Sequence, residues 1–213
     1  MFLVTTANQN FWKTDEKILF LGEWCKLYDQ KHIWSKLDYE TVPSHWDERE
    51  KLDDRYVYLD NLSEKYLNSL ASTLNNTHRE DHSTKYWGII LAPWLSVFIG
   101  VIYDRYLSIH SAINFNKVTH TWVAPLNFER WVPNDTLAFI SKAYGDVNFN
   151  LYLYSQLITK LGKVSFEFKD DHAFTDLEDQ ARVKPLSISA NIKVNIKSFL
   201  NKISSKIPDR YNQ

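Results

Sequence analysis

Short apolar runs alternate with longer amphipathic segments along this chain, and the alternation predicts its fold. Apolar runs at 2–6, 17–22, 118–124 and 164–168 have the length of strands, and the second is apolar at four successive positions. A continuous apolar run of this length is typical of a strand that is covered on both faces. Strands separated by helices favour an α/β fold with a Rossmann-like, mostly parallel sheet.

Two long segments have helical periodicity, and the first spans about 45–74. Its apolar residues recur at intervals of three and four, and Ser44 precedes it as a candidate N-cap. Asp47 lies three positions after Ser44, in an arrangement that resembles a capping box. A weaker helical pattern at 27–38 comes before it. The sequence therefore predicts one long amphipathic helix in this region.

The second long helical segment, at 84–114, contains 18 successive uncharged residues at 86–103. That length is sufficient for a membrane span. Pro93 interrupts the run, and Asp104 and Arg105 close it without a flanking basic cluster. These features favour a central core helix over a membrane-spanning one.

Two shorter helices are predicted, one from Asn134 as N-cap to Gly145 and one over about 146–162. Residues 1–165 are thus expected to form one Rossmann-like α/β domain that includes the two long helices. The remaining residues, 166–213, are expected to form a tail, in which an acidic loop precedes a basic amphipathic segment that fits either a helix or a strand. The lysines of that segment are usually solvated in such a pattern, and a peripheral membrane contact with anionic lipid is the alternative.

Composition narrows the classes of function. A formal net charge of −1 over 213 residues argues against nucleic-acid binding, because such proteins usually carry a basic excess. Cys25 is the single cysteine, which excludes an intrachain disulfide and a cysteine-rich zinc site, and the seven histidines lack the spacing of a metal site. No secretory signal is visible in the first residues, so we expect a cytoplasmic protein. The five glycines form no phosphate-binding loop, so we expect no cofactor bound by this chain itself.

Polar residues follow the first two predicted strands, where a parallel sheet forms its ligand crevice. Thr5 and Thr6 end the first strand, and their hydroxyls could bind a phosphate or a sugar hydroxyl. Glu23 follows the second strand and could bind a sugar hydroxyl or act as a general base, and the alternative is an ion pair with a nearby lysine or arginine. Cys25 is expected to be a buried structural residue rather than a nucleophile.

A second polar cluster opens the first long helical segment. His45, Asp47 and Arg49 could hold an anion there, although helix capping and a surface ion pair explain them equally well. His45 is also a second candidate for a general base. Of the eight tryptophans, Trp24 and Trp46 flank these polar candidates, so we expect them to stack on sugar rings while most others pack in the core.

Several separate blocks of residues carry a resemblance to a known family. They are FLVTTA, ILFLGEWC, HIWSKLD, HWDEREKL, DHSTKYW, the helix APW…YDRY and WVPND, and they span about residues 2–165. On these blocks the chain resembles the N-terminal region of a large bacterial family of transferases associated with surface-polysaccharide and lipopolysaccharide gene clusters. The resemblance implies a glycosyltransferase-like protein of two Rossmann-like halves, as in GT-B-like enzymes, of which this chain would be the N-terminal half.

In two-domain glycosyltransferases of this type, the N-terminal half generally holds the acceptor and the C-terminal half the activated donor. The resemblance therefore implies a carbohydrate or glycolipid acceptor bound by this chain, and a nucleotide-sugar donor bound by a C-terminal partner half. Glu23 or His45 would deprotonate the acceptor hydroxyl. The alternative is a non-catalytic interaction module that pairs with a separate C-terminal subunit.

Overall fold

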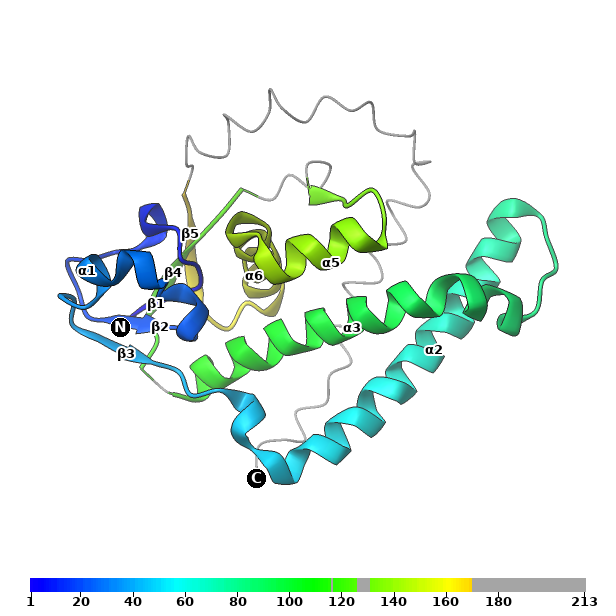
Figure 1. Cartoon of the computed structure of the whole chain (residues 1–213), viewed down its shortest axis with the longest axis horizontal. Coiled ribbons are helices and arrows are strands. Elements are labelled where there is room, and N and C mark those ends of the chain that lie inside the picture. The colour runs from blue at the N-terminus through cyan, green and yellow to red at the C-terminus, as the bar shows by residue number, and fades with distance from the viewer. Residues whose placement is uncertain (116, 126–130, 170–213) are drawn as a thin grey trace.

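The computed structural model describes residues 1–115, 117–125 and 131–169, and its centre is a five-stranded sheet (Figure 1). All neighbouring strands are parallel. The strands lie in the order β3-β2-β1-β4-β5 and comprise Phe2–Val4 (β1), Ile18–Phe20 (β2), Tyr39–Thr41 (β3), His120–Val123 (β4) and Ser165–Phe168 (β5). This architecture confirms the predicted α/β, Rossmann-like fold.

The strands differ in burial according to their place in the sheet. Every side chain of β1 and β2 is buried, as their continuous apolar runs predict. β3 was not among the predicted strands, because it is a three-residue edge strand, is only partly buried and has no apolar run. β5 ends at Phe168, and the acidic loop and basic segment expected after it lie outside the described residues.

The order of the strands reverses direction once. From β1 the chain steps to β2 and β3, and it then crosses to β4 and β5 on the other side of β1. Because crossovers between parallel strands are right-handed, the two directions place their connections on opposite faces. Figure 1 shows α1 (Lys31–Trp34) on one side of the sheet, and α6 (Val147–Leu161) on the other. The gap between β1 and β4 is the switch point at which open α/β sheets bind ligands.

The first long helix begins later than the sequence suggested. Residues 45–51 form two short 3₁₀ turns, η4 (His45–Asp47) and η5 (Arg49–Lys51), and α2 follows over Leu52–His78. Ser44 does cap, but it caps η4, since its hydroxyl accepts a hydrogen bond from the Trp46 backbone N–H at 3.3 Å. The predicted capping box at this point is therefore wrong, and the first of these turns packs on α3.

Of the two shorter helices, α6 packs on β4, and α5 (Thr136–Gly145) packs on α6 and α3. Asp135, rather than the predicted Asn134, is the N-cap of α5, because its carboxylate accepts a hydrogen bond from Ala138 N at 2.7 Å. An ionised cap also interacts favourably with the helix dipole. Gly145 is the last residue of α5 rather than a left-handed residue beyond it, and the left-handed glycine is Gly162, which ends α6.

The second long helix, α3, spans Thr84–Asn114 as predicted, with Pro93 inside it. α2 and α3 form a long antiparallel hairpin that extends well beyond the sheet (Figure 1). Every buried residue of α3 lies at or after Leu95, so its C-terminal part is the expected core helix. The N-terminal part is mostly exposed. By length and apolar composition α3 could cross a membrane, a test that core helices of soluble proteins also pass, and it is the one such helix in the described part of the chain.

Candidate active site

The first predicted site residues, Thr5 and Thr6, follow β1 at the switch point and are almost completely buried. The Thr6 hydroxyl accepts a hydrogen bond from the Asn8 backbone N–H at 3.1 Å, and the Thr6 carbonyl accepts one from the Trp12 indole at 2.8 Å. These bonds fix the turn after β1. Neither threonine lines the pocket described below.

Trp24 follows β2 in the 3₁₀ turn η2 (Glu23–Cys25), and its ring folds back over Gly22. A Cβ at Gly22 would meet the Trp24 ring at 2.1 Å, so the close approach requires glycine. The Trp24 ring is stacked parallel on the buried ring of Tyr154 from α6, with 6.2 Å between centroids. The GEW sequence therefore positions one face of an indole against the core and leaves the side chain 44% exposed.

The neighbours of Trp24 in the same turn lie in opposite surroundings. The Glu23 side chain is 80% exposed and pairs with Lys26 at 2.9 Å. Cys25 is completely buried and its thiol donates to the Val4 carbonyl. Burial raises the pKa of the Cys25 thiol to about 12, so it is protonated at neutral pH and has little nucleophilic character. Cys25 is thus a structural residue, as expected.

His45 and Trp46, which follow β3, meet a carboxylate of α3. The Trp46 indole N–H donates to Asp104 Oδ1 at 2.6 Å, and His45 Nε2 lies 3.2 Å from the same oxygen. The His45 side chain is 95% buried, and its Nε2 approaches Asp104 without the alignment of a hydrogen bond. Trp46 and Asp104 are 58 positions apart in the sequence, so only folding brings them together.

Asp104 is the electrostatic centre of this group. Burial of the carboxyl disfavours its charged form, but the contacts from His45, Arg105 and the Trp46 indole outweigh that cost and hold the pKa of Asp104 below its ordinary value. Arg105, the next residue on α3, forms an ion pair with Asp104 Oδ2. Asp104 is therefore ionised at neutral pH, and protein donors contact both of its oxygens without using all of their lone pairs.

Arg105 links Asp104 to α5 and α6. Its guanidinium donates to Asn150 Oδ1 of α6 and, at 2.9 Å, to the carbonyl of Ala143 near the C-terminus of α5. A cation is favourable there because the last carbonyls of a helix carry partial negative charge. The guanidinium also lies 5.9 Å from the centre of the Tyr154 ring. A continuous set of contacts thus runs from Trp24 through Tyr154 and Arg105 to Asp104.

Arg55 of α2 fixes the backbone of His45. It is buried, donates to the His45 carbonyl and pairs with Glu48 at 3.1 Å. Its guanidinium lies over the Trp46 ring, 5.6 Å from the centroid, in a cation–π arrangement. The other two predicted residues of this cluster, Asp47 and Arg49, are exposed and do not line the pocket described next.

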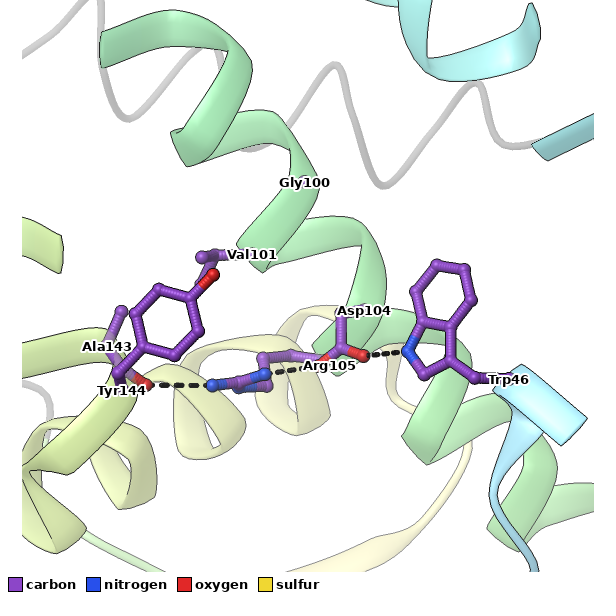
Figure 2. Close-up of a pocket in the computed structure, with 7 residues that line it drawn as sticks. All are labelled: Trp46, Gly100, Val101, Asp104, Arg105, Ala143 and Tyr144. Carbon is purple, nitrogen blue, oxygen red and sulfur yellow. Dashed lines mark hydrogen bonds and ion pairs between the residues drawn. The ribbon is translucent and has the colours of Figure 1, made fainter. Parts of the chain in front are cut away.

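An open pocket of about 320 Å³ lies beside Asp104. Its lining comes from η4, α3 and α5 and comprises Trp46, Gly100, Val101, Asp104, Arg105, Ala143 and Tyr144. Figure 2 shows Trp46 and Tyr144 on opposite sides, with the Asp104–Arg105 pair between them. The pocket therefore combines an anion, a cation and two aromatic walls, a set suited to a polar ligand with flat apolar faces.

Sequence reasoning missed Asp104, Arg105 and Tyr144 as site residues. A signal existed for the first two, because a charged pair inside a predicted core helix needs buried partners. No local pattern identifies Tyr144, which is 79% exposed at the end of α5. Among the described residues, no group of three or more histidine, cysteine, aspartate or glutamate side chains could hold a metal ion.

Comparison with known proteins identifies the family. No curated protein and no solved structure matches the chain significantly. A family model described as LIC12162 family transferase matches residues 1–212, which is nearly the whole chain. The match agrees with the transferase resemblance of the separate sequence blocks. The chain therefore belongs to the LIC12162 family of transferases.

Proposed function

We propose that this chain is the acceptor-binding domain of a sugar transferase, and that the pocket beside Asp104 holds the acceptor hydroxyl. The observation that carries the proposal is an ionised carboxylate in an aromatic-walled pocket, with the buried His45 imidazole 3.2 Å behind that carboxylate and outside the pocket lining. Transferase membership makes a group-transfer reaction the appropriate class of chemistry. The sugar itself is inferred from the lining of the pocket.

The lining suits a carbohydrate. The Trp46 and Tyr144 rings can pack on the C–H faces of a sugar ring, while Asp104 and Arg105 offer acceptor and donor groups to its hydroxyls. Trp24, which is partly exposed and stacked on the buried Tyr154, offers a further aromatic face outside the pocket lining. A pocket of about 320 Å³ can take one or two sugar rings.

His45 is the residue we assign as general base. Asp104 is a poor base, because its lowered pKa and its bonds to Trp46 and Arg105 mean that the carboxylate binds a proton weakly. Its role is to orient the His45 imidazole and to stabilise the imidazolium that forms on proton transfer. The acceptor O–H gives its proton to His45, its oxygen bonds to the anomeric carbon, and the bond from that carbon to the leaving phosphate breaks with its electron pair.

Glu23 remains the competing candidate for the base. Its side chain is exposed and paired with Lys26, and, unlike His45, it has no contact with a described residue that lines the pocket. A base at Glu23 would require the acceptor to bind at the end of β2, against Trp24, instead of beside Asp104. Substitution of each residue separately distinguishes the two positions.

The sugar donor is inferred from the family resemblance alone. The chain has no glycine-rich phosphate loop, so we assign a nucleotide-sugar donor to a C-terminal partner half and surface-polysaccharide synthesis to the assembled enzyme. The leaving phosphate named above is that of this donor. Cytoplasmic location, where nucleotide sugars are made, is part of the same proposal.

Binding of methyl glycosides to the whole chain, measured by saturation-transfer NMR, tests the proposed function. We expect at least one glycoside to bind, about tenfold weakening in Asp104→Asn because a bond to a charged group is lost, and little change in Glu23→Gln. Glu40→Gln is the matched control, since Glu40 is an ion-paired carboxylate of β3 outside the pocket. Equal effects of Asp104→Asn and Glu40→Gln, or no glycoside binding at all, would contradict the proposal.

A further inference from the structure

One face of α3 carries a row of residues from the tip of the hairpin to the candidate active site. With about 100° between successive residues of a helix, these positions fall within an arc of about 120°. We call this row the α3 track, and it consists of Tyr86, Ile89, Ile90, Pro93, Val97, Gly100, Val101 and Asp104. Its apolar positions lead directly to a polar end at Asp104.

The outer part of the α3 track is exposed apolar surface. The exposed fraction is 73% for Ile89 and 52% for Ile90, and Tyr86 and Pro93 are exposed as well. No charged residue interrupts α3 between Lys85 and Asp104. Exposed apolar surface that is grouped in this way usually marks an interaction site.

The inner part of the α3 track opens into the pocket. Gly100, Val101 and Asp104 belong to the track and also line the pocket. A Cβ placed on Gly100 would meet no atom within 4 Å, so the space at this position is open. A glycine inside a helix lowers its stability, and packing of α3 against its neighbours does not require one here. Gly100 thus lies between the outer row and Asp104, with open space at its Cβ position, while Val97 and Val101 pack partly on the core.

The dimensions of the α3 track favour a single apolar chain over a protein partner. The track is one side chain to two side chains wide, whereas a stable protein–protein interface needs about 800 Å² from each partner. From Tyr86 to Asp104 it is about 27 Å long, at about 1.5 Å per residue. A narrow apolar row that ends at a carboxylate suits an amphiphile with one long chain and a polar head.

We infer that the acceptor is an amphiphile whose apolar chain lies along the α3 track while its hydroxyl-bearing head occupies the pocket beside Asp104. The inference rests on the proposed function for the identity of the head, and on the apolar row for the chain. It assigns the exposed half of α3 to substrate binding. Continuity of the row with the pocket is the reason for choosing the substrate's own chain as its occupant.

Binding of hexyl, octyl and decyl glucoside to the whole chain, each below its micelle-forming concentration, provides the test. Complete burial of one methylene is worth about fourfold in affinity, and a one-sided track should give about twofold. Because decyl glucoside has four more methylenes than hexyl glucoside, we expect it to bind about 16-fold tighter. Affinities that do not change with chain length would overturn the inference.

Substitutions in α3 test where the apolar chain of the glucoside lies. The double variant Ile89→Gln/Ile90→Gln keeps helix-forming residues and should remove most of the gain with chain length, and Gly100→Leu should do so by filling the open space. The matched control is Val57→Gln, because Val57 is an exposed apolar residue of α2 outside the track, with an exposed fraction of 62%. Equal losses in the control and in the double variant would also count against the track.

Two further measurements separate the remaining outcomes. If decyl glucoside binding depends on Ile89 and Ile90 but not on Asp104→Asn, the track is supported and the proposed function is not. If the double variant instead abolishes self-association in sedimentation, or binding to neutral phosphatidylcholine vesicles, while the glucosides bind unchanged, the row is a protein or membrane contact and the inference fails.

Discussion

The two parts of α3 have similar apolar sequences but lie in different surroundings. Residues 95–114 pack on the sheet, on α5 and on α6, and Ile109 and Ala112 there are fully buried. Residues 84–94 contact the described structure mainly through α2, and Ile89 and Ile90 remain exposed. An apolar helix segment thus indicates only that other apolar groups must cover it. Tertiary contacts decide whether the chain itself provides them.

The charged pair Asp104–Arg105 lies in the buried part of α3. It gives that part a second role, which is to organise the candidate site. Each side chain is about four-fifths buried and reaches partners on a different element, His45 and Trp46 on one side and Asn150 on the other. A charge in such a place is kept because its partners compensate its desolvation. The comparison therefore separates a part of α3 that organises a site from a part that offers a surface.

The largest expected effect tests the difference between the two parts of α3 most directly. Ile109→Ala should lower the free energy of unfolding by about 2–5 kcal/mol, because it leaves a cavity between α3 and the sheet. Ile89→Ala should change it by no more than about 0.5 kcal/mol, because Ile89 is mainly exposed. Urea denaturation of both variants measures the difference. A cost at Ile89 near that at Ile109 would mean that the outer part of α3 is also packed.

Asp104→Asn should have the next largest effect, a loss of about 1–3 kcal/mol at neutral pH, because Arg105 loses its ionised partner. The pKa of Asp104 is lowered on folding, so its ionised form stabilises the protein above the ordinary pKa of 3.8. That contribution disappears as the pH falls through the lower pKa of the folded state. The difference between wild type and variant should therefore shrink below about pH 4, as measured by denaturation at pH 7 and pH 3.

The sequence predicts those features that depend on residues close together along the chain, and it misses those that depend on distant residues. The strand at 18–20 and the helix Thr84–Asn114 were predictable, because apolar runs and periodicity are local signals. β3 was not, because an edge strand needs no apolar run. His45 and Trp46 were identified as candidates, but their partner Asp104 lies on another element and only folding brings them together.

Two indole hydrogen bonds, one at each part of α3, test the same difference with a smaller expected change in stability. Trp46 donates to the ionised carboxylate of Asp104, whereas Trp87, near the outer end of α3, donates to the neutral amide oxygen of Asn75 at 2.8 Å. Hydrogen bonds to charged groups contribute about twice as much as neutral ones. We expect Trp46→Phe to cost about 1.5 kcal/mol and Trp87→Phe about 0.5–1 kcal/mol in urea denaturation. Equal costs would show that the Asp104 charge adds nothing to this contact.

The smallest expected effect concerns the two glycines inside α3. Gly100→Ala should raise the free energy of unfolding by about 0.5–1 kcal/mol, because alanine favours the helix and its Cβ enters open space. Gly88→Ala should gain less, since its Cβ would lie 3.3 Å from a methyl group of Leu67. Thermal denaturation measures both, and a loss of stability at Gly100 would mean that the pocket beside it is closed. If the gain appears and glucoside binding falls in the same variant, then Gly100 is retained for the open space it leaves at the site, at the expense of helix stability.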